Sequence, residues 1–284
     1  MFEFWNAVAE QPLARNAVLA SLLLSMTCGV VGSYVVVRRI TYIAAGVAHC
    51  VLGGMGAARY LQTVHGWSFV HPIHGALVAA LLAAAVIGWM SLTSREREDS
   101  AISAVWSVGM ASGVLFIYAT PGYSQDLMGY LFGDILLVTR QHLYLIAGLN
   151  VLLLVVVARW YDAFQLVCFD EEFARTRNVN VSGFYILLLA LTALTVVALS
   201  VIVGIVLVIA LLTLPAALAG RFAGSLAQMM VLATILCALF CLAGLTFSYG
   251  PDLPAGPAII VIGGGCYFVV AAAGYLRRHF QRTQ

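Results

Sequence analysis

The chain has 284 residues, of which 63% are hydrophobic and only 9% are charged. Soluble domains are about 45–50% apolar and about 25% charged, so this chain has too few polar residues to cover a water-exposed globule. We therefore expect an integral membrane protein. All fourteen basic residues are Arg, and the absence of Lys excludes an ATP-binding P-loop and a lysine Schiff base. The formal net charge of +2 does not indicate a nucleic-acid partner.

Apolar runs long enough to cross a bilayer, about 20 residues each, recur along the whole chain. They predict an all-α polytopic membrane fold of eight or nine transmembrane helices in a single domain, residues 1–284. The number stays open because the sixth and seventh runs are almost continuous. Glu3 and Glu10 precede the first run, which is not typical of a signal peptide, so we expect no cleavage. The predicted helices lie near residues 15–37, 43–62, 72–93, 101–119, 142–158, 183–200, 203–220, 227–247 and 258–276.

The arginines orient these helices, because cytoplasmic loops retain positive charge. With nine spans and an external N-terminus, only Arg15, Arg59 and Arg140 fall on the outer side. The other eleven fall on the inner side, so the pattern predicts an N-out, C-in topology. The inner arginines are Arg38, Arg39, Arg95, Arg97, Arg159, Arg175, Arg177, Arg221, Arg277, Arg278 and Arg282.

The inner segment between the fifth and sixth spans, residues 159–183, is the densest charged stretch of the chain. An acidic triplet begins a short helical pattern there and Arg175 lies near its end, an order that is favourable for the helix dipole. Glu171 and Arg175 have the i,i+4 spacing of a helical ion pair. The segment is either a solvated connecting helix or a docking helix for a soluble partner. Its apolar stripe consists of Phe169, Phe173 and Val179.

His49 is the one His that falls well inside a predicted span. Ionisable groups at membrane depth are costly and usually face a cavity or a partner. A neutral imidazole is a ligand for zinc, iron and manganese. We therefore treat His49 as a candidate contact of a transported ion; the alternative is an imidazole that hydrogen-bonds to a neighbouring helix.

Two further groups carry weaker signals for metal binding. His65, His71 and His74 fall near the outer surface, where they could serve metal entry. Three His without a fixed fourth ligand are a weak zinc signature, so ordinary interfacial polar residues are the favoured explanation. Cys237 and Cys241 have a spacing that suits a soft ion, although small residues in membrane helices more often form packing surfaces. Outer acids that either attract a cation or are simply solvated are Asp126, Asp134 and Asp252.

Five stretches follow one another along nearly the whole chain. They are RRITYIAAGVAHCVLGGMGAARYL (38–61), REREDSAISAVWSVGMASGVLFI (95–117), TPGYSQDLMGYLFGDILLV (120–138), FDEEFARTRNVNV (169–181) and IVGIVLVIALLTLPAALAGRF (202–222). In this order they resemble the membrane-spanning permease subunit of ABC importers for zinc, manganese, iron and related metal ions.

The resemblance implies a multi-pass permease of the cytoplasmic membrane, surrounded by lipid and working as a homodimer. Its implied partners are two cytoplasmic ATPase subunits and an extracytoplasmic metal-binding protein. It implies no permanent cofactor, only a transported divalent ion: zinc, manganese or iron. Many members carry an Asp four residues before the position of His49, where this chain has Ala45. The helix that couples the permease to the ATPase would lie within about residues 160–182, and its residues would be Asp170, Glu171, Glu172, Phe173, Ala174 and Arg175.

Two other classes of function make different demands on the sequence. A gradient-driven secondary transporter, the main alternative, needs membrane-embedded carboxylates or a His relay. Every Asp and Glu of this chain falls in a loop or near the end of a predicted span. A membrane metalloenzyme needs a clustered ligand set such as H-E-x-x-H, and no such string occurs. We therefore expect a transport subunit that is not itself an enzyme.

Overall fold

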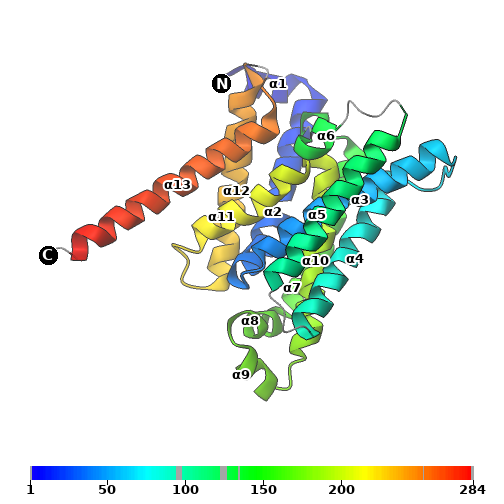
Figure 1. The fold of residues 1–284 in the computed structure, drawn as a ribbon. Coiled ribbons are helices and arrows are strands. Elements are labelled where there is room, and N and C mark those ends of the chain that lie inside the picture. Colours follow the sequence, from blue (N-terminus) through cyan, green and yellow to red (C-terminus); the bar gives the residue numbers. More distant parts are fainter. Residues whose placement is uncertain (1, 94–97, 122–126, 134, 252, 283–284) are drawn as a thin grey trace.

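The computed structural model describes residues 2–93, 98–121, 127–133, 135–251 and 253–282, and all regular structure in these ranges is helical (Figure 1). The predicted all-α membrane fold is confirmed. The helices are α1 (Phe2–Glu10), α2 (Pro12–Val37), α3 (Thr41–Val64), α4 (Pro72–Thr93), α5 (Glu98–Ala119), α6 (Leu127–Phe132), the 3-10 helix η1 (Ile135–Leu137), α7 (Arg140–Arg159), α8 (Tyr161–Phe169), α9 (Glu171–Thr176), α10 (Val181–Val203), α11 (Ile205–Ala219), α12 (Leu226–Tyr249) and α13 (Ala255–Arg282).

Eight of these helices are long and apolar enough to cross a membrane: α2, α3, α4, α5, α7, α10, α12 and α13. The predicted seventh span corresponds to α11, which has only 15 residues. At a rise of 1.5 Å per residue it is about 22 Å long, shorter than a hydrocarbon core of roughly 30 Å. The structure thus has eight full-length spans and one short apolar helix in the described part of the chain.

Although α11 is short, it carries the chain from one end of the bundle to the other. It begins after Gly204, which lies against Gly133. At its other end Ala219 belongs to an apolar cluster covered by Val37 of α2. We call the two ends of the bundle the Gly204 end and the Arg38 end. The Gly204 end holds α1, α6 and the α12–α13 connection, and the Arg38 end holds the α2–α3 turn, α8 and α9 (Figure 1).

The reversal between α10 and α11 depends on glycine. Gly204 has φ 79° and ψ 159°, a backbone conformation that is essentially restricted to Gly. Gly133 also has a positive φ, 59°. A Cβ added at either glycine would collide with the backbone of the other. The segment containing α6 therefore lies directly against the α10–α11 turn.

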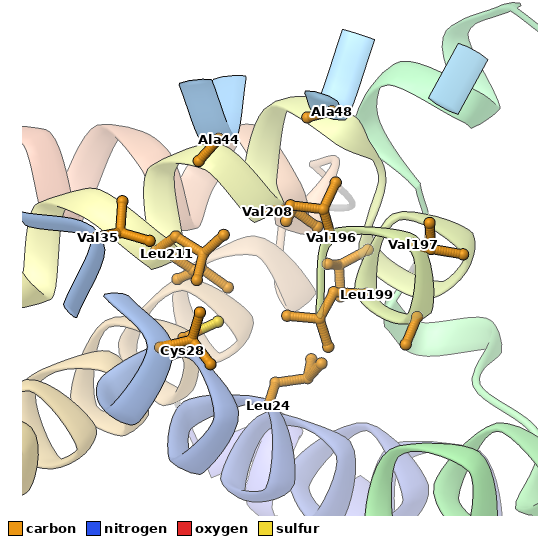
Figure 2. Packing of buried hydrophobic residues seen from close by; sticks show 14 of the residues in the cluster. Leu24, Cys28, Val35, Ala44, Ala48, Val196, Val197, Leu199, Val208 and Leu211 are labelled. Carbon is orange, nitrogen blue, oxygen red and sulfur yellow. The ribbon is translucent and has the colours of Figure 1, made fainter. Parts of the chain in front are cut away.

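The interior of the bundle is formed mainly by α2, α3 and α10, whose apolar windows are each 72% buried. Figure 2 shows Leu24 and Cys28 of α2 near Leu199 of α10, with Val208 and Leu211 of α11 completing the cluster. By contrast, α5 and α13 bury only 17% and 11% of their windows, and α13 inclines away from the bundle in Figure 1. These apolar outer faces suit lipid or a second subunit as surroundings.

Nine arginines whose side chains are described lie near one or the other end of the bundle. Helix ends place three of them at the Gly204 end: Arg15, Arg59 and Arg140. Of the arginines whose side chains are described, twice as many lie at the opposite end: Arg38, Arg39, Arg159, Arg175, Arg177 and Arg221.

Candidate ion path and coupling segment

His49 lies two turns into α3 and is half-buried. Its Nδ1 is 2.8 Å from the carbonyl oxygen of Ala45. A carbonyl oxygen only accepts hydrogen bonds, so Nδ1 carries the proton. In the neutral ring this leaves the lone pair of Nε2 available to a ligand, which is the state in which imidazole binds metals. The ring therefore hydrogen-bonds to the backbone of its own helix and not of a neighbouring one, and contact of its Nε2 with a transported ion stays a prediction.

The imidazole of His49 stacks on the indole of Trp106 from α5, with ring centroids 4.4 Å apart and planes inclined by 30°. The indole of Trp106 also lies near the ring of Tyr42, with centroids 5.6 Å apart. Tyr42 Oη shares a 2.6 Å hydrogen bond with Ser103 Oγ of α5. These four side chains form a column along the seam between α3 and α5 that we call the His49 column. Sequence reasoning missed Trp106, because nothing in the spacing joins residues 57 positions apart.

Glycines bring α3 and α5 close enough for this column to form. A Cβ added at Gly113 of α5 would lie 2.8 Å from the backbone nitrogen of Gly53, and one at Gly109 would lie 2.9 Å from Cα of Cys50. Gly109 and Gly113 are the G-x-x-x-G pair of the fourth predicted span, a pattern typical of close helix packing. The seam therefore owes its geometry to small residues, and the aromatic column fills the part of the seam nearer the Arg38 end.

Ala45 stands where the family resemblance implies an Asp, and it is buried at 9% exposure. Across the described residues, no three His, Cys, Asp or Glu side chains are grouped so as to hold a metal ion. In one chain His49 is thus the one His, Cys, Asp or Glu of the column. Such an arrangement suits transient contact rather than storage, since an ion in transit must also leave.

The outer histidines are all exposed and lie at the Gly204 end. His71 and His74 are adjacent, with ring centroids 5.6 Å apart, and the backbone N–H of His71 donates to Nδ1 of His74 at 3.4 Å. His65 instead meets Tyr60 edge-on, at 5.6 Å. The structure therefore brings two of the three predicted residues together. The outer acids Asp126, Asp134 and Asp252 lie outside the described residues.

Cys237 and Cys241 of α12 lie close to Cys28 of α2. All three have 0% exposure. Figure 2 shows Cys28 inside the packed core. Enclosure between two helices agrees with the packing interpretation of this pair of cysteines and leaves an ion no route to them.

The predicted coupling segment forms two short helices, α8 and α9, at the Arg38 end (Figure 1). Asp170 caps α9, because its Oδ1 accepts from the backbone N–H of Phe173 at 2.9 Å. Ala174 is fully buried in an apolar cluster with Val167 and Val181. One side of α9 is thereby anchored to α8 and α10, and the opposite side is open to solvent.

The exposed side of this segment is amphipathic. Phe169 is 63% exposed and Phe173 45% exposed, and both line an open groove of about 450 Å³ together with Asp162 and Arg177. Val179, which the sequence predicts on the same stripe, lies instead against the buried cluster of Val167, Ala174 and Val181.

Cys168 near the end of α8 is buried, and this burial raises the pKa of its thiol to about 11.

Glu171 makes a different ion pair from the one that its spacing predicted. Its carboxylate pairs with Arg38 at the end of α2, not with Arg175 one turn along α9. It is the one ion pair within the described part of the chain. The guanidinium of Arg38 also lies 5.4 Å from the ring centroid of Tyr185 on α10. From the sequence, Arg38 is only one of the positive charges that orient the helices in the membrane. Its partner Glu171 lies 133 residues away, so no local pattern predicts the pair.

Comparison with known proteins adds to this geometry. The profile of the ABC 3 transport family matches residues 10–274. The chain belongs to the ABC 3 transport family. It is therefore a membrane-spanning permease subunit of an ABC transporter in the cytoplasmic membrane, and ATP hydrolysis lies in a separate subunit.

Relatives of this ABC 3 permease match along almost their whole length. It is 38% identical over 256 residues to a probable metal transport system membrane protein of Chlamydia trachomatis, covering 90% of this chain and 87% of that protein. It is 32% identical over 267 residues to the manganese transport system membrane protein MntC of Listeria monocytogenes, covering 94% and 92%. The solved structure of PsaBC from Streptococcus pneumoniae in complex with Fab matches 94% of each chain, with a TM-score of 0.82 at 27% identity.

Proposed function

We propose that this permease imports a divalent transition-metal ion and that a separate ATPase drives it through α9. The metal-transport names of the relatives support the class of substrate. The observation on this chain that carries the proposal is the available Nε2 of His49, the one His of the described residues that lies well inside a span. Zinc, manganese and iron all accept imidazole ligands, so His49 does not distinguish between them. Measurement of metal uptake identifies the transported ion.

The Arg38 end faces the cytoplasm in this proposal. It holds the greater number of described arginines, as the positive-inside rule requires. It also holds α9, whose exposed Glu172 and Phe173 offer a charged and aromatic surface to a soluble partner. The Gly204 end, with His65, His71 and His74, then faces the extracytoplasmic metal-binding protein that delivers the ion.

A homodimer completes the path. One chain offers a single imidazole, and a second copy across a two-fold axis would bring a second His49 to the same ion. The poorly buried apolar faces of α5 and α13 leave room for such a partner as well as for lipid. The enclosed core cysteines lie outside this path.

Docking through α9 is tested by removing its exposed contacts. The double variant Glu172→Arg, Phe173→Asp should no longer co-purify with the ATPase, while Glu10→Arg, a charge reversal at the Gly204 end, should retain it. Both variants should remain folded, because the substituted side chains are exposed. Undiminished recovery of the ATPase with the α9 double variant would refute docking through this helix.

A further inference from the structure

The two neighbouring acids of α9 point to different surroundings. Glu172 is exposed, whereas Glu171 is half-buried and paired with Arg38. The side chains of the pair retain 23% exposure at Arg38 and 36% at Glu171, so water screens the pair only in part. Within one helical turn, α9 thus carries one acid that faces outward and one that binds the α2–α3 turn.

Arg38 is joined to α3 by a stiff turn. Arg39 adopts the left-handed conformation, φ 61°, and donates its backbone N–H to Val36 O. Ile40 donates to Val35 O at 2.9 Å, and its own carbonyl accepts from Ala44 as α3 begins. These bonds form a Schellman motif, in which the end of one helix is closed and the next begins without a flexible link. A displacement of Arg38 therefore moves the start of α3.

The same guanidinium is held between further helices. Arg38 lies over the ring of Tyr185 on α10, and Tyr185 Oη shares a 3.1 Å hydrogen bond with Ser91 Oγ on α4. A polar cavity of about 500 Å³ adjoins the ion pair and is also lined by Tyr42 of the His49 column. The ion pair thus has space in which to change its geometry next to the first turn of α3.

We propose that the Arg38–Glu171 ion pair is the contact that transmits movement of α9 to α3 and so to the imidazole of His49. The inference rests on the proposed function, in which the ATPase moves α9. It divides the work of the helix: Glu172 and Phe173 bind the ATPase, and Glu171 passes the movement on. Arg38 and Glu171 act as positioning residues, since neither contacts the ion.

A charge swap tests this assignment. The complex with its ATPase is reconstituted in lipid vesicles, and manganese accumulation and ATP hydrolysis are measured per mole of folded complex. Arg38→Glu and Glu171→Arg should each retain the ATPase yet lower the ions transported per ATP about tenfold, as expected for coupled charges in contact. The double variant Arg38→Glu, Glu171→Arg should recover most of this ratio. Arg159→Glu, an exposed reversal at the same end, should leave the ratio unchanged.

The possible results separate the two proposals. A swap that fails to recover coupling while the ATPase stays bound would overturn the transmission role, as would an Arg38→Glu complex with normal coupling. If the variants lower only the yield of folded complex and leave ions per ATP unchanged, the pair is merely structural and the inference fails. Loss of the ATPase from Arg38→Glu would overturn the division of roles within α9. The proposal that the ATPase docks on α9 is tested separately, because it fails only if the variant Glu172→Arg, Phe173→Asp still binds the ATPase.

Discussion

The imidazole of His49 lies against the indole of Trp106, with ring centroids 4.4 Å apart, and its Nδ1–H donates a hydrogen bond to the carbonyl oxygen of Ala45. The ring is thus held on one face and at one nitrogen, and Nε2 remains its only free ligand atom. A fixed tautomer and ring orientation are features of histidines that bind metal.

Removing the imidazole should impair transport without disrupting the subunit. We expect His49→Ala to lower metal uptake about tenfold or more, the size of loss seen when a group that supports metal binding is deleted. Uptake of zinc, manganese and iron into cells measures the effect, with the amount of complex in the membrane measured alongside. His142→Ala at the start of α7 is the matched control and should transport normally. Normal uptake by His49→Ala would exclude the side chain from the path.

Restoring a carboxylate one turn before His49 should change the preferred ion. Position 45 is on the same face of α3, because residues four apart are neighbours on a helix. Carboxylate oxygen is a ligand that manganese favours, whereas imidazole nitrogen is one that zinc favours. Ala45→Asp should therefore raise the ratio of manganese uptake to zinc uptake. Ala45→Asn has the same shape without the charge and should leave the ratio near that of the parent chain. An equal ratio in both variants would show that position 45 does not contact the ion.

The turn between α10 and α11 should tolerate no side chain. Gly204→Ala places a Cβ against the backbone of Gly133 and forces a conformation that costs about 1–3 kcal/mol before any clash. The midpoint of thermal unfolding in detergent should therefore fall by several degrees or folded protein should be lost. Gly148→Ala, in α7 with nothing within 4 Å of the new Cβ, is the control and should be neutral or slightly stabilising. Equal stability of the two variants would contradict the close approach of α6 to this turn.

Cys168 should react slowly with alkylating reagents at neutral pH. Burial raises its pKa to about 11, so little thiolate is present at pH 7, and thiolate is the reactive form. Between pH 7 and pH 10 the rate of maleimide labelling should rise about tenfold per unit, since the thiolate fraction does so below the pKa. A cysteine introduced at the exposed position Thr176 should label faster and reach its plateau at a lower pH. Mass spectrometry of the labelled peptides distinguishes the two sites.

Local sequence pattern predicted most helices of this chain but not their contacts. Apolar runs mark where a membrane helix is favourable, and capping residues such as Asp170 mark where α9 begins. The pairing of Glu171 went wrong because spacing along a helix ranks Arg175 first, whereas tertiary packing brings Arg38 nearer. The partner of His49 was missed for the same reason, as Trp106 reaches it only through the glycine-lined seam between α3 and α5.

The short helix α11 shows a second limit of the sequence. Its apolar run continues that of α10, and only the positive φ of Gly204 ends one helix and starts the other. The same residues therefore suit one continuous helix or a full span followed by a short helix until the contact with Gly133 is known. Arg221, beyond the end of α11, lies 5.2 Å from the ring centroid of Tyr267 on α13.

The central claim is that the permease moves metal only when a separate ATPase drives it. Transport in lipid vesicles reconstituted from purified subunits tests this claim most directly. Manganese accumulation is measured with the permease alone, with the permease and its ATPase, and with an ATPase unable to hydrolyse ATP. The account predicts ATP-dependent accumulation only with the active ATPase, and no ATP hydrolysis by the permease alone. Accumulation by the permease alone under a proton or sodium gradient would contradict it and identify a secondary transporter.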